Sequence, residues 1–161
     1  MGIQYKKEYM ERAVAVAHKG INSGCGGPFG CVIVCGDKVV AEAHNTVVRD
    51  NDPTAHGEVN AIRMAGKNLG RFDMSDCVLY TTREPCPMCL ASIMWARIPV
   101  VYSAMNIDDA KRIGFDDKPF YDAMGDKING KKNQFVTEEF HREESAIKLF
   151  EKYDGMEKTR Y

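Results

Sequence analysis

Apolar residues recur at intervals of three and four positions near the start of the chain, in residues 4–21. Charged residues fill the positions between them, so this segment predicts an amphipathic helix. The same spacing predicts three further helices along the chain. They cover residues 59–70, with a start near Pro53, and residues 86–97 and 143–153.

Short runs of β-branched and other apolar residues separate these predicted helices. Residues 31–44 contain two such runs around a tight turn, which predicts a β-hairpin. Residues 77–82 and 99–104 predict buried strands, and residues 133–138 can add another before the last helix. Because helices alternate with strands, we expect an α/β fold, a three-layer α/β/α sandwich around a mixed sheet, formed as a single domain over residues 1–161.

The charges of the 161-residue chain nearly cancel, since 22 Lys and Arg residues stand against 23 Asp and Glu residues. A chain without a strong net field is a poor match for phosphate backbones or anionic lipids, so we do not expect nucleic acid as a partner. No apolar run reaches the roughly 18 residues of a membrane helix, and the first residues lack the apolar stretch of a signal peptide. We therefore expect a cytoplasmic protein that does not enter the membrane.

Two cysteines three positions apart begin one of the predicted helices, in the segment EPCPMC. On a helix, Cys86 and Cys89 lie on one face, and the helix N-terminus stabilises their thiolates, the form that binds metal. Redox pairs share this spacing, but His56 stands at another predicted helix start and completes a ligand set that suits zinc. Three protein ligands leave the fourth position for water, which zinc converts to a hydroxide nucleophile near neutral pH.

Glu58 lies two positions after His56, in the segment PTAHGEVNAI. This spacing points the two side chains in different directions around the helix start, so His56 can bind zinc while Glu58 transfers protons as the catalytic carboxylate. His-x-Glu followed by Pro-Cys-x-x-Cys is the signature of zinc-dependent base deaminases. The sequence therefore predicts hydrolytic deamination with zinc as the cofactor.

The remaining cysteines provide no second metal-binding pair. They lie in a loop or in predicted strands, where each is expected to be an ordinary small buried residue: Cys25, Cys31, Cys35 and Cys77. We expect reduced thiols and no disulfide framework in this chain. A non-catalytic, zinc-stabilised binding module is an alternative from another functional class, and it would have no use for Glu58 beside the metal.

Five short segments carry a resemblance to a known family. They are GGPFG, NDPTAHGEV, EPCPMC, MWAR and GFDD. Together they resemble the cytidine deaminase-like superfamily and, within it, the bacterial guanine deaminases. The resemblance implies a central five-stranded sheet, bound zinc, and hydrolysis of guanine to xanthine and ammonia, with Glu58 delivering a proton to the leaving group.

The same resemblance implies roles for residues around the zinc site. Asn45 would hydrogen-bond the purine, and Phe29 and Trp95 would pack against its ring. Asp117 would contact the amidine edge of the base, and the main-chain amide of Gly57 would lie beside its carbonyl-side edge. Such a set suits a neutral, planar nucleobase, because ring stacking provides affinity and a few buried polar groups provide discrimination.

The resemblance also implies a homodimer in which the two chains exchange their C-terminal segments. Residues 155–161 would close the partner's active site as a lid, with Tyr161 in contact with the substrate. Gly155 interrupts the last predicted helix at the place where such a segment would leave the domain.

Three positions depart from the guanine deaminase pattern. Gly57 and Cys31 stand where the family usually has Ala, and Arg83 stands where a Cys is common. The preferred base is therefore open, and cytosine, isocytosine, ammeline and guanosine are alternatives to guanine. Editing of adenosine in tRNA is a further alternative. It needs a basic patch near the pocket, for which Lys131 and Lys132 are available.

Overall fold

The computed structural model describes residues 4–124 and 136–157, and its centre is one mixed β-sheet. Five strands form this sheet in the order β2-β1-β3-β4-β5. Their bounds are Gly30–Cys35 (β1), Lys38–His44 (β2), Cys77–Arg83 (β3), Val100–Met105 (β4) and Thr137–Phe140 (β5). β1 pairs antiparallel with both β2 and β3, whereas β3, β4 and β5 run parallel. The expected five-stranded mixed sheet is confirmed.

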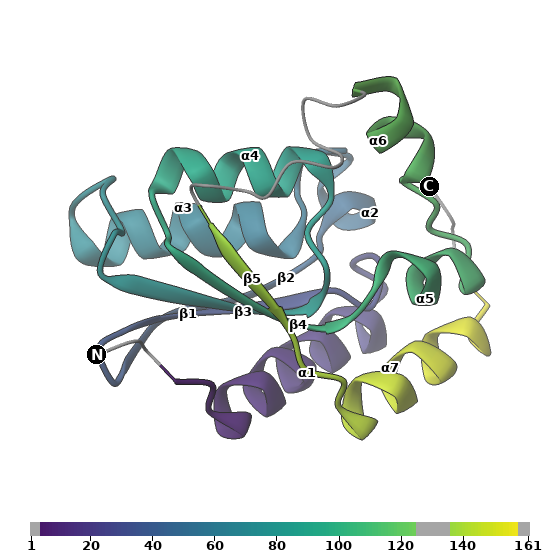
Figure 1. The fold of residues 1–161 in the computed structure, drawn as a ribbon. Coiled ribbons are helices and arrows are strands. Elements are labelled where there is room, and N and C mark those ends of the chain that lie inside the picture. The colour runs from purple at the N-terminus through teal and green to yellow at the C-terminus, as the bar shows by residue number, and fades with distance from the viewer. Residues whose placement is uncertain (1–3, 125–135, 158–161) are drawn as a thin grey trace.

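Helices cover both faces of the sheet. Figure 1 shows α3 and α4 on one face and α1 and α7 on the other, with α5 and α6 toward one end. The bounds are Lys7–Asn22 (α1), Val47–Asp50 (α2), Gly57–Leu69 (α3), Pro87–Ala96 (α4), Ile107–Arg112 (α5), Lys118–Met124 (α6) and Glu144–Asp154 (α7). This arrangement confirms the three-layer α/β/α sandwich. Within the described residues, no helix combines the length and apolar character needed to span a bilayer.

Alternating side chains of the central strands supply two hydrophobic cores. In β1 and β3, every second side chain packs against α1 and α7 on one face of the sheet. The side chains that alternate with these pack against α3 and α4 on the other face. The first set includes Val32, Val34, Val78 and Tyr80, and the second includes Cys31, Ile33, Cys77 and Leu79. Every residue of β3 is buried. A strand at the middle of a sheet covered on both faces requires this pattern.

Two segments differ from the sequence expectation in their details. Residues 106–120, for which the hydrophobic pattern predicts no regular element, contain α5 and the start of α6. α5 begins with a capping box, in which the side chains of Asn106 and Asp109 each accept a hydrogen bond from the other residue's amide. β5 begins at Thr137, where its pairing with Val100 of β4 begins, and residues 133–135 of the expected strand lie outside the described ranges.

The topology places two helix starts next to each other. α3 follows the loop after β2, and α4 follows β3 after a short connection. The two helices lie on the same face of the sheet (Figure 1) and share one hydrophobic core. Because β1 and β3 are antiparallel, the beginning of β1 lies beside the end of β3. The polar segments singled out in the sequence therefore meet at this end of the sheet.

Gly30, at the start of β1, lies so close to α1 that a side chain would collide with the helix. A Cβ atom there would stand 2.1 Å from the carbonyl oxygen of Ala13 and 2.9 Å from the Cβ of Ala17. We expect Gly30→Ala to lower the free energy of unfolding by about 2–4 kcal/mol, because the backbone of α1 must move. Urea denaturation followed by circular dichroism measures this change.

Gly66, within α3, provides the matched control. The atoms nearest to a Cβ at this position are the Arg71 carbonyl oxygen at 3.6 Å and Met74 Cε at 3.7 Å, which are ordinary contacts. Gly66→Ala should therefore raise the free energy of unfolding by about 0.5–1 kcal/mol, because alanine favours a helix more than glycine does. Equal effects of the two substitutions would contradict this account of Gly30.

Candidate active site

Two helix starts bring three metal-binding side chains together. His56 is the N-cap residue of α3 and Cys86 is the N-cap residue of α4, and both have an extended backbone. Cys89 lies in the first turn of α4, on the same face as Cys86. Pro87 occupies the first helical position, where its missing amide hydrogen removes no helix hydrogen bond. The ligand atoms of His56, Cys86 and Cys89 lie within 4.8 Å of one another.

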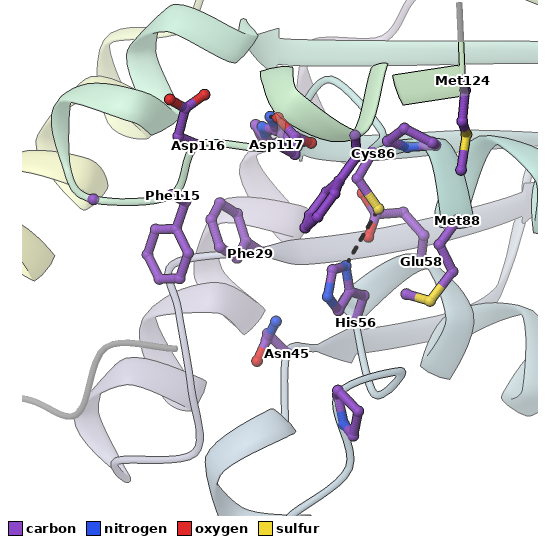
Figure 2. A pocket seen from close by; sticks show the side chains of 15 residues that line it. Phe29, Asn45, His56, Glu58, Cys86, Met88, Phe115, Asp116, Asp117 and Met124 are labelled. Atoms are coloured by element: carbon purple, nitrogen blue, oxygen red, sulfur yellow. Dashed lines mark hydrogen bonds and ion pairs between the residues drawn. The ribbon is translucent and has the colours of Figure 1, made fainter. Parts of the chain in front are cut away.

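The spacing of these three donor atoms fits one tetrahedral ion. Nδ1 of His56 lies 3.6 Å from Sγ of Cys86 and 3.5 Å from Sγ of Cys89. With Zn–S bonds of about 2.3 Å and Zn–N bonds of about 2.0 Å, a tetrahedral site separates nitrogen from sulfur by about 3.5 Å. Figure 2 shows His56 and Cys86 pointing toward each other at the wall of a cavity. Two thiolates and one imidazole in this arrangement fit zinc.

The protonation states of the three side chains depend on one another. The hydrogen bond from Cys89 lowers the pKa of Cys86, and the same interaction together with burial raises the pKa of Cys89. Burial by itself lowers the pKa of His56, but the hydrogen bond with Cys86 and the negative charges of Cys86 and Glu58 outweigh it, so the pKa is raised. The cluster therefore favours one thiolate, and metal binding requires that Cys89 lose its proton as well.

Glu58 lies beside the three ligands without being part of their cluster. Its side chain is buried, and Oε1 accepts a hydrogen bond from the Thr81 hydroxyl at 2.9 Å. Oε2 accepts one from Sγ of Cys89 at 3.4 Å. Burial is the largest cause that raises the pKa of Glu58 above its ordinary value. A buried carboxylate at the cavity wall, oriented by the central strand, can accept and release a proton.

A cavity of about 560 Å³ opens over these residues. Its size lies within the range of small-molecule sites. Figure 2 shows that its walls come from several segments far apart in the sequence, among them the start of β1, the beginning of α3 and residues 115–117. The aromatic lining consists of Phe29, Phe115 and Phe120, and the polar lining includes Asn45, Glu58, Arg83 and Asp117. This combination can enclose a flat ring that carries polar edges.

Phenylalanines form the aromatic wall of this cavity. The rings of Phe29 and Phe115 meet edge to face, with centroids 4.9 Å apart. The structure does not place Trp95 at the cavity of its own chain, because this side chain is 86 % exposed near the end of α4. Trp95 lies six residues after Cys89, which places it about 120°, or one-third of a turn, around the helix from the inward-facing Cys89. Within the described chain, the aromatic wall consists of Phe29, Phe115 and Phe120, and the expected contact of Trp95 with the base stays a prediction.

Asn45 and Gly57 both approach the main chain of Phe29. The amide of Asn45 donates a hydrogen bond to the Phe29 carbonyl oxygen at 2.9 Å, and its side-chain Oδ1 accepts one from the amide of Val47 at 3.1 Å. A Cβ atom on Gly57 would lie only 3.1 Å from the same Phe29 oxygen. Glycine therefore lets the start of α3 lie close to the cavity wall. Asn45 is buried and lines the cavity, as its expected role requires.

Arg83, which departs from the family pattern, forms a buried ion pair with Asp117. Nη1 of Arg83 donates to Oδ2 of Asp117 at 2.7 Å, and Nη2 donates to Oδ1. The two side chains are 9 % and 11 % exposed, and both line the cavity. Burial acts to lower the pKa of Arg83, but its hydrogen bonds to Asp117 and the charge of that carboxylate outweigh burial and raise it. Asp117 therefore borders the cavity with each oxygen already bound to a guanidinium nitrogen.

Several sequence expectations lie partly or wholly outside the described residues. They include most of the expected lid at residues 155–161, with Tyr161 at its end. They also include the expected basic residues Lys131 and Lys132. α7 ends at Asp154, and Gly155 follows it with helical backbone angles. The lid and the contact of Tyr161 with substrate stay predictions.

The structure adds site residues that sequence reasoning did not single out. Phe115 and Met88 lie within the quoted segments GFDD and EPCPMC, so the resemblance carried a signal for both. Phe120 and Thr81 lie outside every quoted segment. Their roles follow from where α6 and β3 place them, beside the cavity and beside Glu58.

The sequence matches the family model of the cytidine and deoxycytidylate deaminase zinc-binding region over residues 3–105. This range contains all three proposed zinc ligands and Glu58. The chain belongs to this family. As a zinc-binding deaminase domain, it presents the expected ligands as one cluster of His56, Cys86 and Cys89.

Two relatives and one solved structure define its place within the deaminase family. The chain is 52% identical to guanine deaminase from Bacillus subtilis over 113 residues, which are 70% of this chain and 72% of that protein. The X-ray structure of guanine deaminase from Bacillus subtilis matches with a TM-score of 0.72 and 38% identity, and the match covers 98% of this chain and 99% of that chain. A tRNA-specific adenosine deaminase from Buchnera aphidicola is 33% identical over 106 residues, covering 66% of this chain and 70% of that protein.

Removing Arg83 leaves the Asp117 carboxylate buried without its partner. We expect Arg83→Met to lower the free energy of unfolding by about 3–5 kcal/mol, because an unpaired buried charge is costly. The double variant Arg83→Met, Asp117→Leu should recover most of this loss, since it removes both charges. Urea denaturation of the deaminase and its variants measures the differences.

The exposed pair of Arg97 and Asp73 provides the control for this experiment. Their side chains are 60% and 35% exposed. Arg97→Met should therefore change the free energy of unfolding by less than about 1 kcal/mol. A loss for Arg83→Met as small as that for Arg97→Met would show that the Arg83–Asp117 pair is not a buried charge pair in solution.

Proposed function

We propose that this protein is a zinc-dependent guanine deaminase, which converts guanine and water to xanthine and ammonia. The arrangement of Glu58 carries the proposal. It is a buried carboxylate outside the ligand cluster, 3.4 Å from one ligand sulfur and at the wall of an aromatic cavity. A structural zinc site has four protein ligands and no need of such a group. The 52% identity to guanine deaminase from Bacillus subtilis supports guanine as the base.

Zinc held by His56, Cys86 and Cys89 would supply a Lewis acid with one open position. Glu58 then has two tasks in the hydrolysis. It takes a proton from the attacking water and delivers a proton to the amino group that leaves as ammonia. Its raised pKa, caused mainly by burial, suits a group that must both gain and lose a proton. The hydrogen bond from Thr81 keeps the carboxylate directed to one position during both transfers.

The cavity residues are proposed to bind and orient the base. Phe29 packs against its ring, and Phe115 of the GFDD segment, which meets Phe29 edge to face, borders the cavity beside it. Asn45 hydrogen-bonds the purine, and the main-chain amide of Gly57 lies beside the carbonyl-side edge. Asp117 contacts the amidine edge, and Arg83 holds its carboxylate fixed in orientation. A carboxylate locked in this way favours a substrate whose donors match its position, which is a source of discrimination between bases.

The assembly and location of the enzyme complete the proposal. We propose a cytoplasmic homodimer of single-domain chains, in which residues 155–161 of each chain, ending in Tyr161, cover the active site of the other. All six cysteines are free thiols, which supports a reducing compartment.

Another amino-heterocycle is the first alternative substrate, because of Gly57, Cys31 and Arg83. Of these, Arg83 is the residue that lines the cavity, whereas Cys31 is fully buried in the core between the sheet and α3. The tRNA adenosine alternative rests on the 33% identity to the Buchnera aphidicola protein. Among the described lining residues, the acidic side chains Glu58, Asp116 and Asp117 outnumber the arginine. This charge pattern disfavours an RNA backbone at the cavity.

Glu58→Gln should keep zinc and lose turnover, because the amide has similar size but cannot transfer the protons. We expect guanine to release ammonia fastest among guanine, isocytosine, cytosine, ammeline, guanosine and adenine, and the Gln variant to be at least about 100-fold slower. Ammonia release and zinc content of each purified protein are the measurements. Glu151→Gln, on the exposed face of α7, is the control and should match the wild type.

The outcomes separate the alternatives. Faster ammonia release from another base would make that base the substrate in place of guanine. It would leave the proposed mechanism unchanged. Activity retained by the Gln variant would refute the role of Glu58, and no release from any base would favour the zinc-stabilised binding module. Deamination of a tRNA anticodon stem-loop with no reaction on free bases would assign the enzyme to tRNA.

Deleting residues 156–161 tests the proposed lid. We expect turnover to fall at least about tenfold with zinc still bound, because the deletion leaves the ligand cluster intact and opens the cavity to water. Mixing this truncated protein with Glu58→Gln protein should restore part of the activity if tails are exchanged, since each intact active site then receives a tail from the other chain. Full activity of the truncated protein alone would refute the proposed lid.

A further inference from the structure

A second pair of thiols lies at the opposite end of β3 from the candidate active site. Cys35 ends β1 and Cys77 begins β3. The two residues are direct partners in the antiparallel pairing of these strands. β3 reaches the cavity at Arg83, so about 20 Å of extended strand separates the pair from the site. Its chemistry is therefore independent of the proposed deamination.

The backbone places Cys35 and Cys77 at a separation that a disulfide can bridge. Directly opposed residues of antiparallel strands have Cα atoms about 4.5–5.5 Å apart, with side chains on one face of the sheet. Disulfides span Cα separations of about 4.4–6.8 Å. The two Sγ atoms already lie within 4.8 Å of each other. Rotation of the side chains can bring them to bonding distance without moving the strands.

The two thiols differ in access, which assigns them different roles. Cys35 is partly exposed, whereas Cys77 is fully buried. Sγ of Cys35 donates to Oδ2 of Asp76 at 3.2 Å, so a proton acceptor stands next to the accessible thiol. Burial and the hydrogen bond with Cys35 raise the pKa of Cys77 to about 12. Cys35 is thus the thiol that an oxidant reaches first, and Cys77 is the thiol that then attacks the oxidised Cys35.

Arg71 contacts both Cys35 and Asp76, and its position disfavours a metal ion at this pair of thiols. Its Nη2 donates to both carboxylate oxygens of Asp76, at 2.7 and 2.8 Å, and to Sγ of Cys35 at 3.6 Å. Cys35, Asp76 and Cys77 have donor atoms close enough for one ion. A cation would have to displace the guanidinium that already occupies this carboxylate, whereas formation of a disulfide leaves the Arg71–Asp76 pair in place.

We propose that Cys35 and Cys77 form a redox modification site, at which a hydroperoxide converts the two thiols into a disulfide within the chain. Sulfur of Cys35 attacks the terminal peroxide oxygen, the O–O bond breaks, and the thiol proton passes to the leaving oxygen, giving a sulfenic acid and an alcohol or water. Sulfur of Cys77 then attacks sulfur of Cys35. The S–O bond breaks, and the hydroxyl group leaves as water with the proton of Cys77. The thiols lose the two electrons that the peroxide gains.

Treatment of the zinc-loaded protein with hydrogen peroxide, followed by alkylation and peptide mass spectrometry, tests the proposal. We expect a linked peptide pair containing Cys35 and Cys77, lighter by two hydrogen atoms, and loss of two of the six thiols with zinc content unchanged. The oxidised protein should unfold at a higher temperature, because the bond closes the chain from β1 to β3. Dithiothreitol should reverse both changes.

Matched variants assign the effect to this pair. Cys35→Ser and Cys77→Ala should each abolish the linked peptide and the shift in unfolding temperature, whereas Cys25→Ser should change neither, because Cys25 lies in the loop after α1. Three results would overturn the proposal. They are zinc loss before any Cys35–Cys77 link forms, oxidation of Cys35 that stops at a sulfinic acid or joins two chains, and a second equivalent of bound zinc that is lost in Cys35→Ser.

Discussion

The meeting of two helix N-termini over one end of the sheet is the constraint on which the site depends. His56 caps α3 and Cys86 caps α4, and their donor atoms must lie 3.6 Å apart for both to reach one ion. Neither helix can rotate or slide by a residue without separating them. The shared core beneath α3 and α4 fixes this relation, and Gly57 lets α3 begin close to the main chain of Phe29.

Burial of charge at this end of the sheet follows from the same packing. Glu58, Arg83 and Asp117 are all buried where the helix starts and the strand ends converge. Each has a named partner, since Thr81 donates to Glu58 and Arg83 holds both oxygens of Asp117. Unpaired, such groups would destabilise the fold by several kcal/mol each. Paired, they supply polar groups of fixed orientation in a cavity whose other walls are aromatic.

β3 joins two regions of different chemistry. At its end, Arg83 and the connection to α4 belong to the cavity and the ligand cluster. At its beginning, Cys77 faces Cys35 of β1 beside the Arg71–Asp76 pair. Between them the strand is buried on both faces. A rigid central strand can therefore hold a thiol pair and a candidate active site in one small domain while keeping them apart.

The sequence by itself determined the layered α/β fold and the main chemistry of the site. Periodicity located the main helices and strands, because burial on one face imposes a repeat of 3.6 or 2 on the residues. The ligands His56, Cys86 and Cys89 and the carboxylate Glu58 could be named because metal binding and proton transfer need those residue types at short, recognisable spacings. The choice of zinc followed from the ligand set.

Only the tertiary structure decided which distant residues meet. Trp95 sits on the outer side of α4 and Phe120 lines the cavity, because the rotation of one helix and the placement of another depend on packing across the whole domain. Asp117 and Arg83 are 34 positions apart, and no local pattern in the sequence predicts their ion pair. The same is true of Cys35 and Cys77, which become neighbours through the antiparallel register of β1 and β3. Contacts of this kind arise from chain topology, which sets residues side by side regardless of their separation in the sequence.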